Sequence, residues 1–164
     1  MTVRDVIKDV EALTLTLTAD FDAPVDRVWQ VLADARQLER WWGPPEWPAA
    51  FPRHDMVEGG ESRYVMTGPE GERMHGWWRV TAVEPPHRLA FEDGFADDNG
   101  EPVDDMPVIQ CEITVRAGAD GRTVLTSTST FSSLEAFEEL QAMGMEEGNR
   151  TAMAQIDAVL ADGA

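Results

Sequence analysis

Residues 12–29 read Ala-Leu-Thr-Leu-Thr-Leu-Thr-Ala-Asp-Phe-Asp-Ala-Pro-Val-Asp-Arg-Val-Trp, and this stretch decides the fold. Every second residue from Leu13 to Phe21 is apolar, with threonine or aspartate between, which indicates a strand with one buried face. Pro24 suits the first turn of a helix, and Asp22 can cap that helix. We therefore expect a strand that passes directly into a helix.

Outward from this stretch, the middle of the chain alternates strands with turns. A short second helix is expected from Ala35 to Trp42, before a Gly-Pro-Pro turn. Turn signals then recur at Gly59-Gly60, Gly68–Gly71, Glu84–Pro86 and Gly118–Gly121. Between them, one parity is apolar: Tyr64, Met66, Met74, Trp78, Val80, Ala82, Leu89, Phe91, Ile109, Cys111, Ile113, Val115, Leu125 and Phe131. The other parity is largely polar, which predicts an antiparallel sheet with one covered face and one wet face.

The last segment has the pattern of one long helix. Ser132-Ser-Leu-Glu135 is a capping-box sequence, and helix-compatible residues continue to about Leu160. A helix over about residues 133–160 would span roughly 40 Å, enough to cross a whole sheet. Its inward stripe is expected to contain Leu134, Phe137, Gln141, Gly144, Met145, Gly148, Ala152, Ile156 and Val159.

The order of these elements is strand, two short helices, further strands and a long helix. It fits an α+β helix-grip fold, in which a curved antiparallel sheet of about seven strands wraps around the C-terminal helix. Several motifs support this: Phe21-Asp-Ala-Pro-Val-Asp-Arg-Val-Trp29, Arg40-Trp-Trp-Gly-Pro44, Gly59-Gly60 with Tyr64, Gly76-Trp-Trp-Arg-Val80, Glu84-Pro-Pro-His-Arg-Leu89, Phe131-Ser-Ser-Leu-Glu135 and Gly144-Met-Glu-Glu-Gly148. On these residues the chain resembles the START-like (SRPBCC) superfamily, and within it the branch related to the C-terminal domain of activators of heat shock protein 90 ATPase. The likeness is strongest over 12–160 and implies a single domain over 1–164.

Composition limits the partners. The chain carries 31 acids and 13 bases, a formal net charge of −18, which opposes binding to phosphate backbones and anionic lipid surfaces. No apolar run approaches the roughly 20 residues that a membrane helix needs, and acids near the N-terminus do not fit a signal peptide. Cys111 is the single cysteine and cannot form an internal disulfide, which fits a reducing compartment. We expect a cytoplasmic protein that binds neither nucleic acid nor membranes.

The sequence shows no motif for catalysis, metal binding or a cofactor. His54, His75 and His87 lie outside metal spacings and are expected to be structural or solvated. The acidic run 93–105 invites a calcium interpretation, but Phe95 stands where an EF-hand loop needs a ligand, so a solvated hairpin is favoured. No nucleophile elbow, phosphate loop or dinucleotide motif is present. We therefore assign no catalytic residue, no metal and no cofactor.

Two features leave alternatives open. Trp41, Trp42 and Trp47 surround a Gly-Pro-Pro turn, and they either plug one end of the core or wall the entrance to a ligand site. Gly144 and Gly148 share one face of the expected final helix, where each glycine costs about 1 kcal/mol relative to alanine. They allow either close packing of the helix on the sheet or empty volume beneath it.

The apolar parity and the resemblance together predict a binding module for a small apolar or amphipathic molecule, held between the sheet and the final helix. Its lining is expected to contain Tyr64, Met66, Met74, Trp78, Phe91, Cys111, Phe131, Met145 and Gly148. Ser127 and Ser129 share this face and are either bonded to backbone or polar contacts for a ligand. A register shifted by one residue would instead line the space with Arg63, Trp77 and Arg79, and would favour an anionic ligand.

The resemblance implies two further functions as alternatives. One is a co-chaperone-like partner of a heat-shock ATPase, although the eukaryotic activators carry an additional N-terminal domain beyond the part that this chain resembles. The other is an enzyme of the cyclase or dehydratase type. Such an enzyme needs an acid or base in the cavity, where the sequence offers only Tyr64 and Asp93. We expect binding rather than catalysis, and the sequence leaves a homodimer open.

Overall fold

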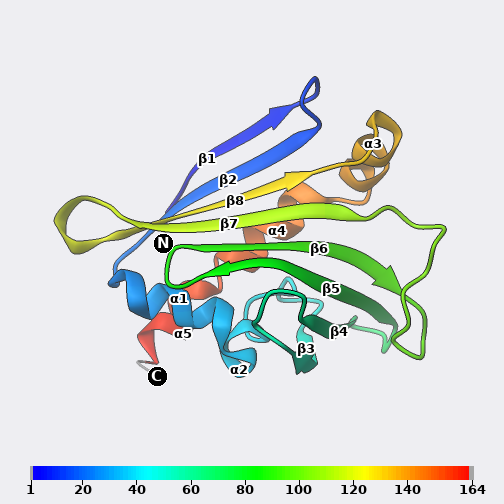
Figure 1. Ribbon diagram of the computed structural model, residues 1–164, viewed down its shortest axis with the longest axis horizontal. Coiled ribbons are helices and arrows are strands. Elements are labelled where there is room, and N and C mark those ends of the chain that lie inside the picture. The colour runs from blue at the N-terminus through cyan, green and yellow to red at the C-terminus, as the bar shows by residue number, and fades with distance from the viewer. Residues whose placement is uncertain (1, 163–164) are drawn as a thin grey trace.

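The computed structural model describes residues 2–162, and within them an antiparallel sheet of eight strands curves around the C-terminal helices (Figure 1). The strands are β1 Thr2–Asp9, β2 Thr14–Phe21, β3 Ala49–His54, β4 Glu61–Thr67, β5 Arg73–Glu84, β6 Arg88–Ala96, β7 Ile109–Ala117 and β8 Thr123–Thr130. The helices are α1 Val25–Ala33, α2 Ala35–Leu38, α3 Leu134–Ala142, α4 Met145–Met153 and α5 Ile156–Ala161, with a 3₁₀ turn at Ala119–Gly121.

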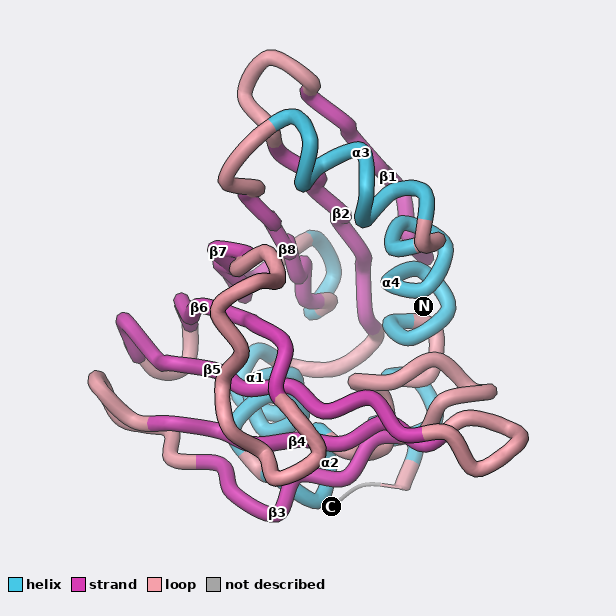
Figure 2. Tube along the Cα trace, turned by 90° about the vertical axis from the view of Figure 1, so that its right-hand side faces the viewer, coloured by secondary structure: helices cyan, strands magenta, loops and turns pink. Residues whose placement is uncertain are grey.

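Neighbouring strands pair in the spatial order β1-β2-β8-β7-β6-β5-β4-β3, and every pairing is antiparallel. After β2 the chain crosses to the far edge of the sheet through α1 and α2, and then returns strand by strand until β8 pairs with β2. In the side view of Figure 2 the sheet bends like a C, and α3 and α4 stand across its open side. The concave face and these helices therefore enclose the interior.

The α+β helix-grip architecture predicted from the sequence is confirmed, but the strand count differs. The described part of the chain, 2–162, contains eight strands instead of about seven, because β1 precedes the first predicted strand. β1 is an edge strand, and Ile7 within it is 57% exposed. An edge strand with charged and exposed side chains lacks the alternation that reveals a half-buried strand. The two short helices accordingly follow the second strand.

The single long helix expected over about 133–160 is wrong, because the segment forms three shorter helices. α3 ends at Ala142, and Gly144 takes a left-handed backbone conformation with φ 84° before α4 begins at Met145. Glycine enters this conformation readily because it has no Cβ to clash. Leu134, which we placed on the inward stripe, is 47% exposed at the start of α3.

Alanine substitutions at the two glycines of this segment should act in opposite directions. Gly144→Ala places a Cβ on a residue with positive φ and should lower the free energy of unfolding by about 1 kcal/mol. Gly148→Ala should raise it by up to about 1 kcal/mol, because the site is helical and the new Cβ would meet only Pro44 Cγ, at 3.9 Å. Urea unfolding measures both effects, and the same sign for both variants would contradict the helix break at Gly144.

The solid part of the core lies where α1 and α5 meet the sheet. Val28 and Leu32 of α1 and Ile156 of α5 are fully buried there. Arg27 joins the helices, since its Nη2 donates to the Val159 carbonyl oxygen at 2.8 Å. Burial of this apolar surface anchors one end of the C-terminal segment and leaves α3 and α4 to cover the rest of the concave face.

Candidate functional site

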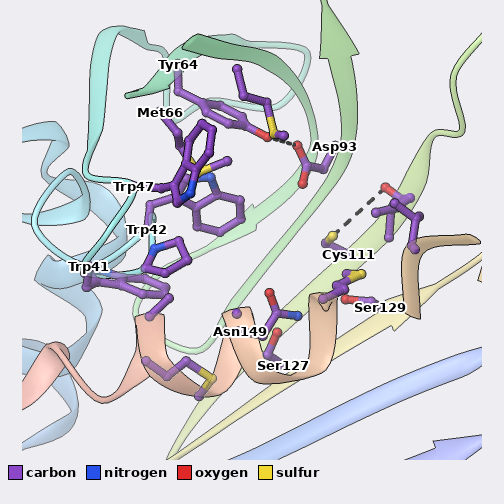
Figure 3. A pocket seen from close by; sticks show the side chains of 18 of the residues that line it. Trp41, Trp42, Trp47, Tyr64, Met66, Asp93, Cys111, Ser127, Ser129 and Asn149 are labelled. Carbon is purple, nitrogen blue, oxygen red and sulfur yellow. Dashed lines mark hydrogen bonds between the residues drawn. The ribbon is translucent and has the colours of Figure 1, made fainter. Parts of the chain in front are cut away.

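A cavity of about 380 Å³ lies between the concave face of the sheet and α4 (Figure 3). Its walls come from β4 to β8, from the turn after α2, and from α3 and α4. Met143, between α3 and α4, lines the cavity and is also 54% exposed, so the cavity reaches the surface at this junction. The position of the cavity is the one in which the sequence predicts a ligand.

The structure brings together most of the residues predicted to line a ligand site. Tyr64, Met66, Met74, Phe91, Cys111, Met145 and Gly148 all line the cavity. Trp78 does not line it, although its parity is inward, because Phe91 stacks on it with ring centroids 3.9 Å apart. Phe131 also lies outside the lining, packs edge-on against Phe137 at 5.1 Å, and borders a separate depression with Trp77.

Gly148 decides between the two interpretations of the helix glycines. A Cβ built on it would meet nothing closer than Pro44 Cγ at 3.9 Å, so the helix does not pack tightly on the sheet at this residue. Gly148 faces the open cavity, so the hypothesis that this glycine allows close packing of the helix on the sheet is wrong. Gly144, in contrast, serves the turn between α3 and α4, since its φ is 84°.

The three tryptophans after α2 wall one end of the cavity, and Trp41 and Trp42 also pack into the core. α2 ends at Leu38, short of the expected Trp42, so Trp41 and Trp42 lie in the turn that follows. Trp41 is 4% exposed, and its Nε1 donates to the Val31 carbonyl oxygen at 2.8 Å. The plug and wall interpretations therefore both describe this cluster.

A glycine and a glutamine hold this tryptophan turn in place. A Cβ at Gly43 would overlap the carbonyl oxygen of Trp47, so only glycine permits the close approach of the two backbone segments. From the junction of α4 and α5, Gln155 Nε2 donates to the Gly43 carbonyl oxygen at 2.7 Å. The turn is thus tied to the helices that close the cavity.

One pair of polar side chains meets inside the apolar lining. Tyr64 on β4 donates its hydroxyl proton to Asp93 Oδ1 on β6, across 2.8 Å (Figure 3). Tyr64 is paired with Gly76 on β5, where any Cβ would overlap the tyrosine ring. Gly76 therefore provides the space through which Tyr64 reaches across β5 to Asp93. The sequence indicated Asp93 only by its parity with Phe91, two residues earlier.

Burial sets the protonation of the ionisable groups in the cavity. It raises the pKa of Asp93 to about 7, and the hydrogen bond from Tyr64 opposes this increase. Burial also raises the pKa of Tyr64 and of Cys111, so both stay neutral near pH 7. Asp93 is consequently the lining group that changes charge close to neutrality.

Further polar groups lie along the opposite side of the cavity. Ser127 and Ser129 on β8 and Asn149 on α4 contribute hydroxyl and amide groups to the lining (Figure 3). No lysine, arginine or histidine occurs among the cavity residues of the described chain. Arg63, Trp77 and Arg79, which a shifted register would bring inward, also lie outside the lining.

His54, His87 and the loop part of the acidic run make local contacts away from this cavity, whereas Asp93, the first residue of that run, lies in β6 and lines the cavity. His54 contacts Ser62 Oγ at 2.7 Å and the Leu32 carbonyl oxygen at 3.0 Å, and His87 Nδ1 lies 2.9 Å from the Val115 carbonyl oxygen. In the loop after β6, Asp97 Oδ1 accepts from the backbone N–H of Asn99 and of Glu101. Over 2–162, no group of three or more metal-ligating side chains comes together, and no helix there could cross a membrane.

The profile of the family described as Activator of Hsp90 ATPase homolog 1-like protein matches residues 22–161. The chain belongs to this family. The assignment to the START-like superfamily made from the sequence motifs is thereby confirmed.

Solved structures show how widely this Activator of Hsp90 ATPase homolog 1-like fold occurs. A protein from Arthrobacter aurescens, solved by NMR, is 50% identical, with 98% of this chain and 93% of that chain covered and a TM-score of 0.93. Protein Ms6760 from Mycobacterium smegmatis is 48% identical, with 97% of both chains covered and a TM-score of 0.88. The AHSA1 protein from Silicibacter pomeroyi shares the fold at 22% identity, with coverage of 92% and 99% and a TM-score of 0.72. No curated protein matches the chain.

The cavity combines two capacities. Its apolar walls can bury a hydrophobic body, while Asp93 and Tyr64 can exchange hydrogen bonds with one polar group. Because Asp93 has a pKa of about 7, it can also accept or release a proton near neutral pH.

Proposed function

We propose that the protein binds a small apolar or amphipathic molecule in the cavity between the sheet and α4. The observation that carries this proposal is the unfilled volume of about 380 Å³ behind apolar side chains. Protein interiors are normally packed as densely as organic crystals, and empty volume forfeits dispersion contacts. Ligand pockets commonly occupy about 300–1,000 Å³ and combine apolar walls with a few polar groups.

The composition of the walls supports an adaptable site. Met66, Met74, Met145 and Met153 line the cavity together with the tryptophans of the turn after α2. Methionine is unbranched and polarizable, so it can reshape its contacts around guests of different outline. Tyr64 and Asp93 would fix the orientation of the guest through its polar group.

Gly148→Leu should block the cavity without unfolding the protein. The leucine side chain would enter open volume, because only Pro44 Cγ lies within 4 Å of the new Cβ. We expect wild type to bind the neutral fluorophore N-phenyl-1-naphthylamine with enhanced emission, and Gly148→Leu to bind it at least about ten-fold more weakly, a loss of about 1.4 kcal/mol. Fluorescence titration measures the affinity for the probe, and circular dichroism shows whether each variant is folded.

Ala154→Leu is the matched control. Ala154 is exposed just after α4, so this substitution adds the same leucine side chain outside the cavity. It should leave probe affinity unchanged. Wild type that fails to bind the probe, or a folded Gly148→Leu protein that binds it normally, would contradict the proposal. Native mass spectrometry of freshly purified protein would also reveal a co-purified small molecule.

The Tyr64–Asp93 pair favours a second candidate function, an enzyme of the cyclase or dehydratase type. A general acid or base works best with a pKa near the working pH, and the pKa of Asp93 is about 7. A bound molecule whose mass changes with time on wild type, but not on Asp93→Asn, would support catalysis over binding alone. A chaperone partner, a cytoplasmic location and the lack of nucleic-acid binding stay predictions.

A further inference from the structure

One oxygen of Asp93 lacks a protein partner. Tyr64 donates to Oδ1, and no hydrogen bond from the described residues, 2–162, reaches Oδ2. Asp93 nevertheless lines the cavity, so this oxygen is available to whatever occupies that space. A guest that displaced water from this carboxylate oxygen without offering a hydrogen bond would bind at a cost, so a donor on the guest is strongly favourable.

The remaining lining disfavours an anionic guest. Within residues 2–162, the cavity lining includes no lysine, arginine or histidine, and the whole chain carries a formal net charge of −18. A carboxylate or phosphate on the guest would meet Asp93 in a medium of low dielectric constant without a compensating cation. Fatty acids and phosphorylated molecules are therefore poor candidates for this site.

Aromatic rings surround the same end of the cavity. The Trp42 ring centroid lies 5.8 Å from that of Tyr64 and 6.1 Å from that of Phe91, and all three residues line the cavity. Aromatic faces attract cations, and a charge-assisted hydrogen bond to a carboxylate is stronger than a neutral one. A carboxylate beside aromatic rings is thus suited to an ammonium group.

From this juxtaposition we propose that the guest is an amphipathic amine, whose ammonium group pairs with Asp93 Oδ2 while its apolar body fills the space beneath α4. This inference rests on the proposed function, because it requires that the cavity bind a small molecule at all. The inference narrows the proposed ligands from apolar or amphipathic molecules in general to those that carry a positive charge.

Binding of an amine should also depend on pH in a defined direction. The pKa of Asp93 is about 7, so its carboxylate form becomes dominant as pH rises from 6 to 8. The ionisable groups that face it are Tyr64 on β4 and Cys111 on β7, and both stay neutral in this range because burial raises their pKa values. Its cross-strand neighbour on β5 is Trp78, and α4 contributes Asn149 to the opposite side of the cavity; neither residue titrates. Amine affinity should therefore increase about ten-fold between pH 6 and pH 8.

Three probes with one naphthalene body test the inference: 2-naphthylmethylamine, 2-naphthalenemethanol and 2-naphthoate, each titrated as a competitor of N-phenyl-1-naphthylamine at pH 8. We expect the amine to bind at least about ten-fold more tightly than the alcohol, a difference of about 1.4 kcal/mol, and the acid to bind most weakly. Asp93→Asn should bring the amine to the affinity of the alcohol.

Glu92→Gln is the matched control for net charge. Glu92 neighbours Asp93 in sequence but accepts from Gln110 Nε2 at 3.0 Å and lies outside the cavity lining, so the variant should keep the preference for the amine. If the alcohol or the acid binds best, or if Asp93→Asn keeps the amine preference, the inference fails while the proposed function stands. If wild type binds neither the fluorophore nor any of the three probes, both fail.

Discussion

Asp93→Asn should raise the free energy of unfolding by about 4 kcal/mol at pH 8 and change it little below pH 4. Burial raises the pKa of Asp93 from 3.8 to about 7, so keeping its carboxylate charged in the folded protein costs stability. By linkage, this difference in pKa corresponds to about 4 kcal/mol. The asparagine carbonyl can still accept the hydrogen bond from Tyr64.

The sign of this effect follows from proton binding. Between about pH 4 and pH 7 the folded protein holds the Asp93 proton, whereas the unfolded chain has released it. Stability from this group therefore falls as pH rises through that window and is constant above it. Asparagine does not titrate, so the stability difference between variant and wild type should grow from pH 4 to pH 7 and then level off.

Urea unfolding at several pH values gives this difference directly, and contributions from groups common to both proteins cancel. Glu92→Gln serves as the control, because this substitution removes the same formal charge from a residue that does not line the cavity. Its stability difference from wild type should not follow the same curve. A destabilised Asp93→Asn protein at pH 8 would mean that the carboxylate is compensated in a way that the contacts of Asp93 do not show.

Gly76→Ala should lower the free energy of unfolding by about 2 kcal/mol, within the range for overpacked sites. A Cβ at this position would overlap the ring and hydroxyl of Tyr64, which lies directly across from Gly76 on β4. The tyrosine has to move, and its hydrogen bond to Asp93 Oδ1 is then lost. Because that bond lowers the pKa of Asp93, its loss should raise the pKa further.

A double variant separates the steric cause from other effects. In a Tyr64→Leu background the overlapping ring atoms are absent, so Gly76→Ala should cost much less than in wild type. Gly94→Ala is the matched comparison, since its Cβ would overlap Trp77, which lies outside the cavity lining. Gly94→Ala should also destabilise the protein but leave the pH dependence due to Asp93 unchanged. Equal costs of Gly76→Ala in both backgrounds would rule out the clash with Tyr64.

The sequence predicts the faces of the sheet because side-chain direction within a strand is a local property. Tyr64, Met66, Met74, Phe91 and Cys111 follow the period of two, and all of them line the cavity. The prediction misplaces Trp78, since parity gives the side of the sheet but not which side chain covers another. Phe91 stacks on Trp78 and so separates it from the cavity. Whether an inward side chain reaches the cavity or is covered by another side chain depends on the residues of the neighbouring strands.

The C-terminal segment shows the same limit in another form. The sequence 132–135 correctly marks the start of a helix, but the N-cap is Ser133 instead of the predicted Ser132, since Ser133 Oγ accepts from the Ala136 N–H in α3. The break at Gly144 was not predicted, since glycine within a helical pattern is compatible with both a helix interior and a left-handed turn. Packing of α3, α4 and α5 against a curved sheet decides between the two.

By itself, the sequence determined the family, the α+β helix-grip class, the inward parity of the strands and the strongly acidic character, because composition, motifs and periodicity are readable without contacts. Only the tertiary structure decided that volume stays unfilled beneath Gly148 and that Tyr64 reaches Asp93. The cavity volume is the volume that the sheet and helices enclose minus the volume of the side chains inside it, so it depends on how all these elements are arranged. The Tyr64–Asp93 bond likewise joins β4 to β6 across Gly76 on β5, so it depends on strand register.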